Sequence, residues 1–134
     1  MPPLLLLHGF MGSGEDWKQV ADLLADAFYC IAPDLPGHGD SGSWGRVHSM
    51  DELAEAVLAV LDFEGISQVF LAGHSMGGYV CMAFADLFPD RLSGYALVHS
   101  TPFADTEEKR ENRDREISLV LCGKKRQIAL VNIP

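Results

Sequence analysis

One serine, set among glycines between an apolar run and a helix-like segment, constrains the fold more than any other feature of this chain. Residues 69–72 read Val-Phe-Leu-Ala, and residues 73–78 read Gly-His-Ser-Met-Gly-Gly. A buried strand that turns sharply into a helix needs small residues where its backbone segments crowd together, and Gly73 and Gly77 supply them. The pattern therefore predicts a strand, a tight turn at Ser75 and a helix, with the serine hydroxyl raised above the end of the strand.

Segments of strand and helix character alternate through most of the chain. Short apolar runs predict buried parallel strands at residues 4–7, 28–32, 68–72 and 95–99. Apolar residues at helical spacing predict helices over 16–27 and 76–87, and Ser49 with Glu52 forms a capping pattern for another helix between them. This order predicts an α/β fold: a parallel sheet with right-handed crossovers and helices on both faces.

Two glycine-rich loops follow the first two predicted strands. Residues 8–10 read His-Gly-Phe, and residues 34–41 read Asp-Leu-Pro-Gly-His-Gly-Asp-Ser. Together with the serine turn, and in this order, these motifs resemble the α/β-hydrolase superfamily. The resemblance is closest to small-molecule serine hydrolases of the esterase and menaquinone-pathway type, and it covers residues 3 to about 103.

The resemblance implies a partial hydrolase core followed by another region. Residues 1–103 would form an incomplete core of about four strands in the spatial order 2-1-3-4, and residues 104–134 would begin the helical cap that such enzymes carry. Residues 105–116 are charged at almost every position, which predicts a solvated helix. The apolar patches at 117–121 and 128–131 are also expected to be helical, with an extended alternative for residues 120–122.

The same resemblance implies a serine hydrolase acting on a small ester or related acyl compound, with no metal and no cofactor. Ser75 would be the nucleophile, and the backbone N–H groups of Phe10 and Met76 would form the oxyanion hole. The substrate pocket would be lined by Gly9, Phe10, Met11, His74 and Met76. Three polar residues are similar to residues that organise loops in the family rather than to its catalytic base: His8, Asp34 and His38.

The catalytic base and acid are the difficulty in this assignment. A serine nucleophile needs a histidine to take its proton and a carboxylate to orient that histidine. The family places these groups after the serine, as acid and then histidine, but no histidine follows His99. His99, at the end of the fourth predicted strand, is the candidate base, and Asp105 is the candidate acid. We expect a truncated hydrolase that is weakly active or inactive alone.

Composition limits the partners and the location. The 134 residues carry a net charge of −9, which argues against nucleic-acid binding. No apolar run approaches the ~20 residues of a membrane span. Three cysteines, far apart and in apolar contexts, predict reduced thiols in a cytoplasmic protein. The second and fourth strands would form open sheet edges, which predicts self-association.

Two other interpretations stay open. The chain could be a non-catalytic fragment that keeps the fold and binds a ligand or a partner chain, since the histidine is missing. It could also be a dinucleotide-binding domain, because Gly9, Gly12 and Gly14 follow a strand and Asp34 lies 20 residues beyond Gly14. However, the glycines are spaced Gly-x-x-Gly-x-Gly, the reverse of the dinucleotide-binding order, and that assignment leaves the serine turn unexplained.

Overall fold

The computed structural model describes the backbone of residues 1–132 and the side chains of residues 1–128. The chain divides into two compact units, Met1–Pro102 and Phe103–Pro134, and each is described by itself.

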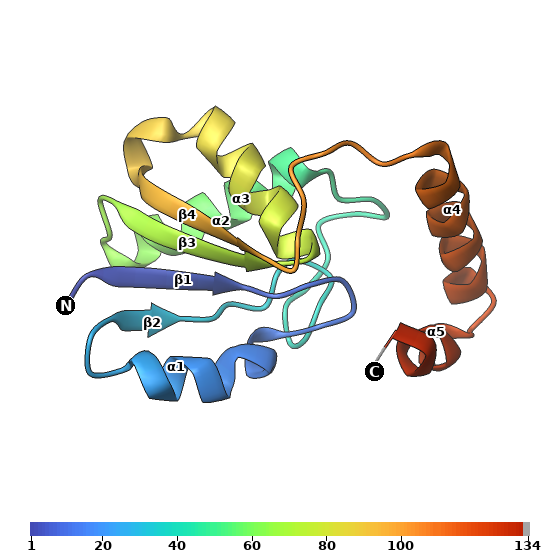
Figure 1. Ribbon diagram of the computed structural model, residues 1–134, viewed down its shortest axis with the longest axis horizontal. Helices are drawn as coiled ribbons and strands as arrows, with labels where there is room; N and C mark the ends of the chain where they lie inside the picture. Colours follow the sequence, from blue (N-terminus) through green and yellow to red (C-terminus); the bar gives the residue numbers. More distant parts are fainter. Residues whose placement is uncertain (133–134) are drawn as a thin grey trace. The chain divides into compact units, whose positions relative to one another are not determined.

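The first unit is built on a four-stranded parallel sheet (Figure 1). Its strands are β1 (Pro3–Leu7), β2 (Tyr29–Ile31), β3 (Val69–His74) and β4 (Leu92–Val98). They lie in the order β2-β1-β3-β4, and every neighbouring pair is parallel. The predicted parallel sheet and its strand order are therefore confirmed.

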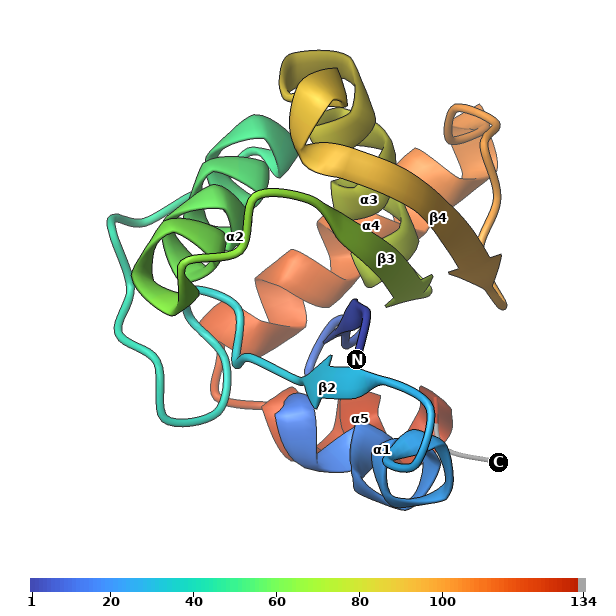
Figure 2. The ribbon, with the colours of Figure 1, turned by 90° about the vertical axis from the view of Figure 1, so that its left-hand side faces the viewer.

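Helices cover both faces of this sheet, as predicted (Figure 2). They are α1 (Lys18–Leu24), α2 (Met50–Glu64) and α3 (Met76–Leu87). The leucines of β1 alternate between two apolar clusters because successive strand residues point to opposite faces. Leu5 and Leu7 belong to a cluster with residues of α2 and α3, whereas Leu4 and Leu6 pack in a cluster that includes α1 residues.

Several predicted boundaries are shifted. The helix predicted over 16–27 begins as a 3₁₀ turn, η1 (Gly14–Trp17), and α1 ends at Leu24. A second 3₁₀ turn, η2 (Pro89–Arg91), leads into β4, which begins at Leu92 rather than at residue 95. β3 extends to His74 because its last residues pair with β4, and Gly73 pairs with Leu7 of β1 as well. Continued pairing carries β3 directly to the serine turn.

The second unit contains two helices, α4 (Glu107–Leu121) and α5 (Lys125–Asn132). The Thr106 side chain caps α4 by accepting the Lys109 N–H at 3.3 Å. Gly123, with φ +80°, lies between the helices in a left-handed conformation that glycine adopts without strain. The helical prediction for 117–121 is correct, and residues 128–131 lie in α5. None of the helices in the described residues is long and apolar enough to cross a bilayer.

Candidate active site

The strand-to-helix turn is confined to a single residue, Ser75. β3 ends at His74 and α3 begins at Met76, so Ser75 makes the turn with φ +52° and ψ −113°. A positive φ is strained for a residue with a side chain, and such strain persists only when the surrounding structure enforces it. The turn therefore has the tight geometry that the sequence predicts, and Ser75 is exposed.

Two glycines make this turn possible because other backbone segments occupy the space of their missing side chains. A Cβ atom at Gly73 would collide with the backbone of Gly77 and lie 2.5 Å from the Gly78 nitrogen. A Cβ atom at Gly77 would collide with the Leu7 carbonyl oxygen and lie 2.8 Å from that of His8. The start of α3 is thus packed against the end of β1.

The loop after β1 lies against the serine turn. A Cβ atom at Gly9 would lie 3.3 Å from Ser75 Cβ and 3.1 Å from His74 Nδ1, so the backbone of Gly9 is in close contact with the serine turn. The Gly12 N–H donates to the Gly9 carbonyl at 3.0 Å, and Met11 has φ +62°. This turn holds Phe10 one residue from the contact with Ser75.

Met76 opens α3 directly after the serine. N–H groups in the first turn of a helix have no acceptor within the helix, and the helix dipole favours negative charge there. The structure thus brings the Gly9–Met11 turn, Ser75 and Met76 together at the carboxyl edge of the sheet.

His8 is fully buried, and both of its ring nitrogens are engaged. Nε2 accepts the Leu35 N–H at 3.0 Å, and Nδ1 lies 2.8 Å from the Gly9 carbonyl oxygen. These partners assign a neutral ring that carries its proton on Nδ1 and donates it to Gly9. His8 therefore links the loops after β1 and β2 and has no free nitrogen to act as a base.

Asp34 links the same two loops through its carboxylate. Oδ2 accepts the Asp40 N–H at 2.9 Å, and Oδ1 accepts the Gly14 N–H at 2.7 Å. These amides lower the pKa of Asp34, since both hydrogen bonds favour the charged carboxylate. His38 lies in this loop, with Nδ1 3.1 Å from the Pro36 carbonyl oxygen and its ring centre 6.2 Å from that of Phe10.

Two histidines lie at the strand ends beside the serine. His74 ends β3, and His99 follows the last residue of β4. Their ring centres are 6.4 Å apart with an edge-to-face orientation, and both residues are exposed. His99 has φ +47°, and among the described residues the other non-glycine residues with positive φ are Met11 and Ser75. All three follow the carboxyl ends of strands, at the edge where ligands bind in α/β sheets.

This combination of fold and turn agrees with a direct comparison of sequences. A family model described as "alpha/beta hydrolase fold" matches residues 2–117. The chain belongs to the α/β-hydrolase fold family. Three relatives illustrate the match and its extent.

An esterase from Thermogutta terrifontis, in a structure titled "malate bound", superposes on this hydrolase-fold chain with a TM-score of 0.94 and 36% identity. The match covers 100% of this chain and 50% of the esterase. Epoxide hydrolase B of Mycobacterium tuberculosis is 39% identical over 106 residues, 77% of this chain and 30% of that protein.

A third relative is the dihydrolipoyllysine-residue acetyltransferase component of the acetoin cleaving system of Pseudomonas putida, 45% identical over 98 residues. That match covers 73% of this chain and 26% of the relative. The chain thus spans half of the esterase and less than a third of the other two proteins.

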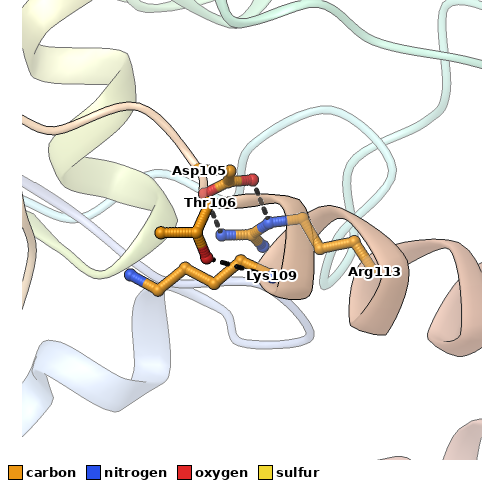
Figure 3. Close-up of polar contacts among 4 residues, drawn as sticks. All are labelled: Asp105, Thr106, Lys109 and Arg113. Atoms are coloured by element: carbon orange, nitrogen blue, oxygen red, sulfur yellow. Dashed lines mark hydrogen bonds and ion pairs between the residues drawn. The ribbon is translucent and has the colours of Figure 1, made fainter.

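Asp105 lies in the second unit of this hydrolase-fold chain. Its carboxylate accepts hydrogen bonds from Nε and Nη2 of Arg113, the latter at 3.2 Å (Figure 3). Arg113 lowers the pKa of Asp105 by stabilising the charged form. Asp105, through Arg113, and the Thr106 cap together fix the start of α4.

Sequence reasoning missed Ser100, whose hydroxyl donates to the Ser75 carbonyl at 2.8 Å. A serine two residues beyond a predicted strand carries no signal of this contact. Cysteine is not an alternative nucleophile in α3, because burial raises the pKa of the Cys81 thiol to about 12. Among the described residues, no three His, Cys, Asp or Glu side chains are grouped so that they could hold a metal ion.

Proposed function

We propose that the chain is the nucleophile-bearing part of a serine hydrolase that acts on a small ester or related acyl compound. The observation that carries the proposal is the strained turn at Ser75, packed against the Gly9–Met11 loop and followed at once by the start of α3. The similarity to an esterase over the whole of this chain supports the choice of an ester.

In the proposed reaction, Ser75 Oγ attacks the carbonyl carbon of the ester while its proton passes to a base. The carbonyl oxygen becomes negatively charged and accepts hydrogen bonds from the N–H groups of Phe10 and Met76. Loss of one such donor typically lowers the rate by ~10²–10³. The alcohol then leaves with a proton from the base, and water hydrolyses the acyl-serine to release the acid.

His99 is the candidate base within this chain, because its ring lies at the same sheet edge as Ser75 and beside His74. His8 is unsuited to this role because Leu35 and Gly9 engage both of its nitrogens. Both carboxylate oxygens of the candidate acid, Asp105, already accept hydrogen bonds from Arg113. We therefore expect low hydrolase activity from this chain alone. We also propose that the protein is cytoplasmic and that the reaction needs no cofactor.

The substrate pocket we propose lies where the β1 loop meets the turn, lined by Gly9, Phe10, Met11, His74 and Met76. Phe10 is half exposed, so its ring can cover an apolar acyl group while its N–H serves the oxyanion. The neighbouring histidine rings of His74 and His99 provide polar groups on the β4 side.

The test is ester hydrolysis by the purified chain, followed as p-nitrophenol release from a short-chain p-nitrophenyl ester. We expect slow turnover that the Ser75→Ala variant lacks and that a Ser118→Ala variant keeps, since Ser118 lies on α4 in the other unit. Equal release by the wild type and by Ser75→Ala would end the proposal.

A second candidate function is a non-catalytic part that binds a partner chain. It is favoured by the absence of any histidine after His99 in the sequence and by the outer positions of β2 and β4 in the sheet. This function predicts a folded chain without serine-dependent hydrolysis that associates through its sheet edges.

A further inference from the structure

We infer that Ser100 is a positioning residue that holds the backbone of Ser75 in the strained turn, an inference that rests on the proposed role of Ser75 as nucleophile. The Ser100 hydroxyl donates to the Ser75 carbonyl oxygen at 2.8 Å. Ser100 lies just beyond β4, so a residue 25 positions from the serine in sequence contacts the turn itself.

The segment at the end of β4 forms hydrogen bonds with both the N–H and the C=O group of Ser75. The Ser75 N–H donates to the Val98 carbonyl at 3.1 Å, and the Ser75 carbonyl accepts from Ser100. The Gly78 N–H donates to the same carbonyl at 2.9 Å. With its N–H and C=O both fixed, Ser75 is held at the positive φ that it would otherwise avoid.

Gly78 provides the space for this contact. A Cβ atom at Gly78 would collide with Ser100 Oγ and lie 2.6 Å from Ser100 Cβ. Gly78 lies within α3 and its φ is not left-handed, so the backbone conformation does not require glycine there. Because glycine inside a helix is less favourable than alanine, close approach of the Ser100 side chain is the reason this position needs it.

The consequence for the proposed reaction is the placement of Ser75 Oγ. Relaxation of φ at Ser75 would swing the hydroxyl and the adjoining Met76 N–H away from a common substrate carbonyl. A displacement of about 1 Å at a reacting group is enough to cost on the order of 10² in rate. The Ser100 hydroxyl bonds to the Ser75 carbonyl oxygen, so we expect its loss to change the rate of attack and not the substrate affinity.

The first test compares covalent labelling of Ser75 by a fluorophosphonate in the wild type and in Ser100→Ala, over a range of probe concentrations. We expect the maximal labelling rate to fall about tenfold while the half-saturating concentration stays unchanged. Ser118→Ala is the matched control, since the Ser118 hydroxyl also donates to a backbone carbonyl, that of Asp114 at 3.1 Å. An unchanged maximal rate in Ser100→Ala would overturn the inference.

The second test does not depend on reactivity and so separates this inference from the proposed function. Exchange of the Ser75 amide hydrogen, which is bonded to Val98, is followed by NMR in the same variants. We expect about tenfold faster exchange in Ser100→Ala and no change in Ser118→Ala. If the wild type is not labelled but the Ser75 amide still exchanges faster in Ser100→Ala, the proposed nucleophile alone is refuted. If the Ser75 amide exchanges at the same rate in the wild type and in Ser100→Ala, the role of Ser100 is refuted.

Gly78→Ala supplies a variant that leaves Ser100 intact but displaces it. We expect Gly78→Ala to lower the maximal labelling rate and to speed exchange of the Ser75 amide, as in Ser100→Ala. These effects keep the test decisive if Ser100→Ala does not fold. In a Ser100→Gly background both Ser100 atoms that the added methyl would strike are gone, and the next atom, in the Leu97 side chain, lies at 3.2 Å. Gly78→Ala should then lower the melting temperature less than it does in the wild type. Equal decreases in both backgrounds would show that the two residues do not interact and would contradict the inference.

Discussion

Replacing Asp34 by asparagine tests how the loop that carries Phe10 is held. The Asp34 carboxylate accepts two backbone N–H groups, from Gly14 after β1 and from Asp40 after β2. Asparagine keeps the shape but offers a single, neutral acceptor, so one hydrogen bond is lost and the other is weakened. The substitution therefore separates the charge and acceptor number of this side chain from its volume.

The expected loss follows from these two contacts. Hydrogen bonds to a charged group contribute about 1.5–3 kcal/mol each, and a neutral bond about 1 kcal/mol. Because Asp34 is half-buried and water partly replaces the missing acceptor, we expect Asp34→Asn to lower the free energy of unfolding by about 2 kcal/mol. For a chain of this length that corresponds to a decrease in melting temperature of about 8 °C.

The pH dependence has a defined sign. The amides of Asp40 and Gly14 lower the pKa of folded Asp34, so its charge stabilises the fold above the unfolded pKa of about 3.9. This contribution is lost as pH falls through the lower folded pKa. Urea unfolding at pH 7 should therefore show the full difference between the wild type and Asp34→Asn, and a series toward pH 3 should show the difference shrinking.

Asp40→Asn is the matched control for this measurement. It removes the same charge from the same loop, while the Asp40 N–H can still donate to Asp34. We expect it to change the free energy of unfolding by less than about 0.5 kcal/mol at pH 7. The reasoning is refuted if Asp34→Asn is no more destabilising than Asp40→Asn, or if its effect stays constant down to pH 3.

Two further predictions concern the turn and the sheet edges. Gly77→Ala places a methyl group against the carbonyl groups of Leu7 and His8, so an overpacking cost of about 1–3 kcal/mol should exceed the helix-propensity gain of ~1 kcal/mol. Urea unfolding should show a lower free energy of unfolding for Gly77→Ala. The control Gly45→Ala, with open space at its Cβ, should keep the free energy of unfolding of the wild type. A Gly77→Ala variant more stable than the wild type would contradict the prediction. Sedimentation velocity should show association that increases with concentration, since β2 and β4 are the outer strands of the sheet, and a single monomer peak throughout would contradict this.

The sequence was sufficient to predict the sheet and the serine turn because both depend on local patterns. Alternating strand and helix signals determine a parallel sheet, and the glycines around Ser75 leave room for a turn that other residues would block. The helix predicted over 76–87 has those bounds in the structure because a glycine-flanked turn starts it and Pro89 follows its end.

Contacts between distant segments could not be predicted in this way. The 98–100 segment holds Ser75 through backbone groups and one serine hydroxyl, and neither has a sequence signature. The left-handed backbone of His99 could not be predicted either, because only a few per cent of non-glycine residues adopt it, although histidine is among the enriched types. The ion pair joins Asp105, which precedes α4, to Arg113, eight positions further along and within the helix, and composition alone does not reveal such a pair.

Mass spectrometry of peptides after treatment with a fluorophosphonate tests directly whether Ser75 is the nucleophile, because it identifies the residue that reacts. We expect one adduct, on the peptide that contains Ser75, in the wild type and none in Ser75→Ala. No adduct under conditions that modify an intact esterase, or an adduct on another serine with Ser75 unmodified, would contradict this expectation.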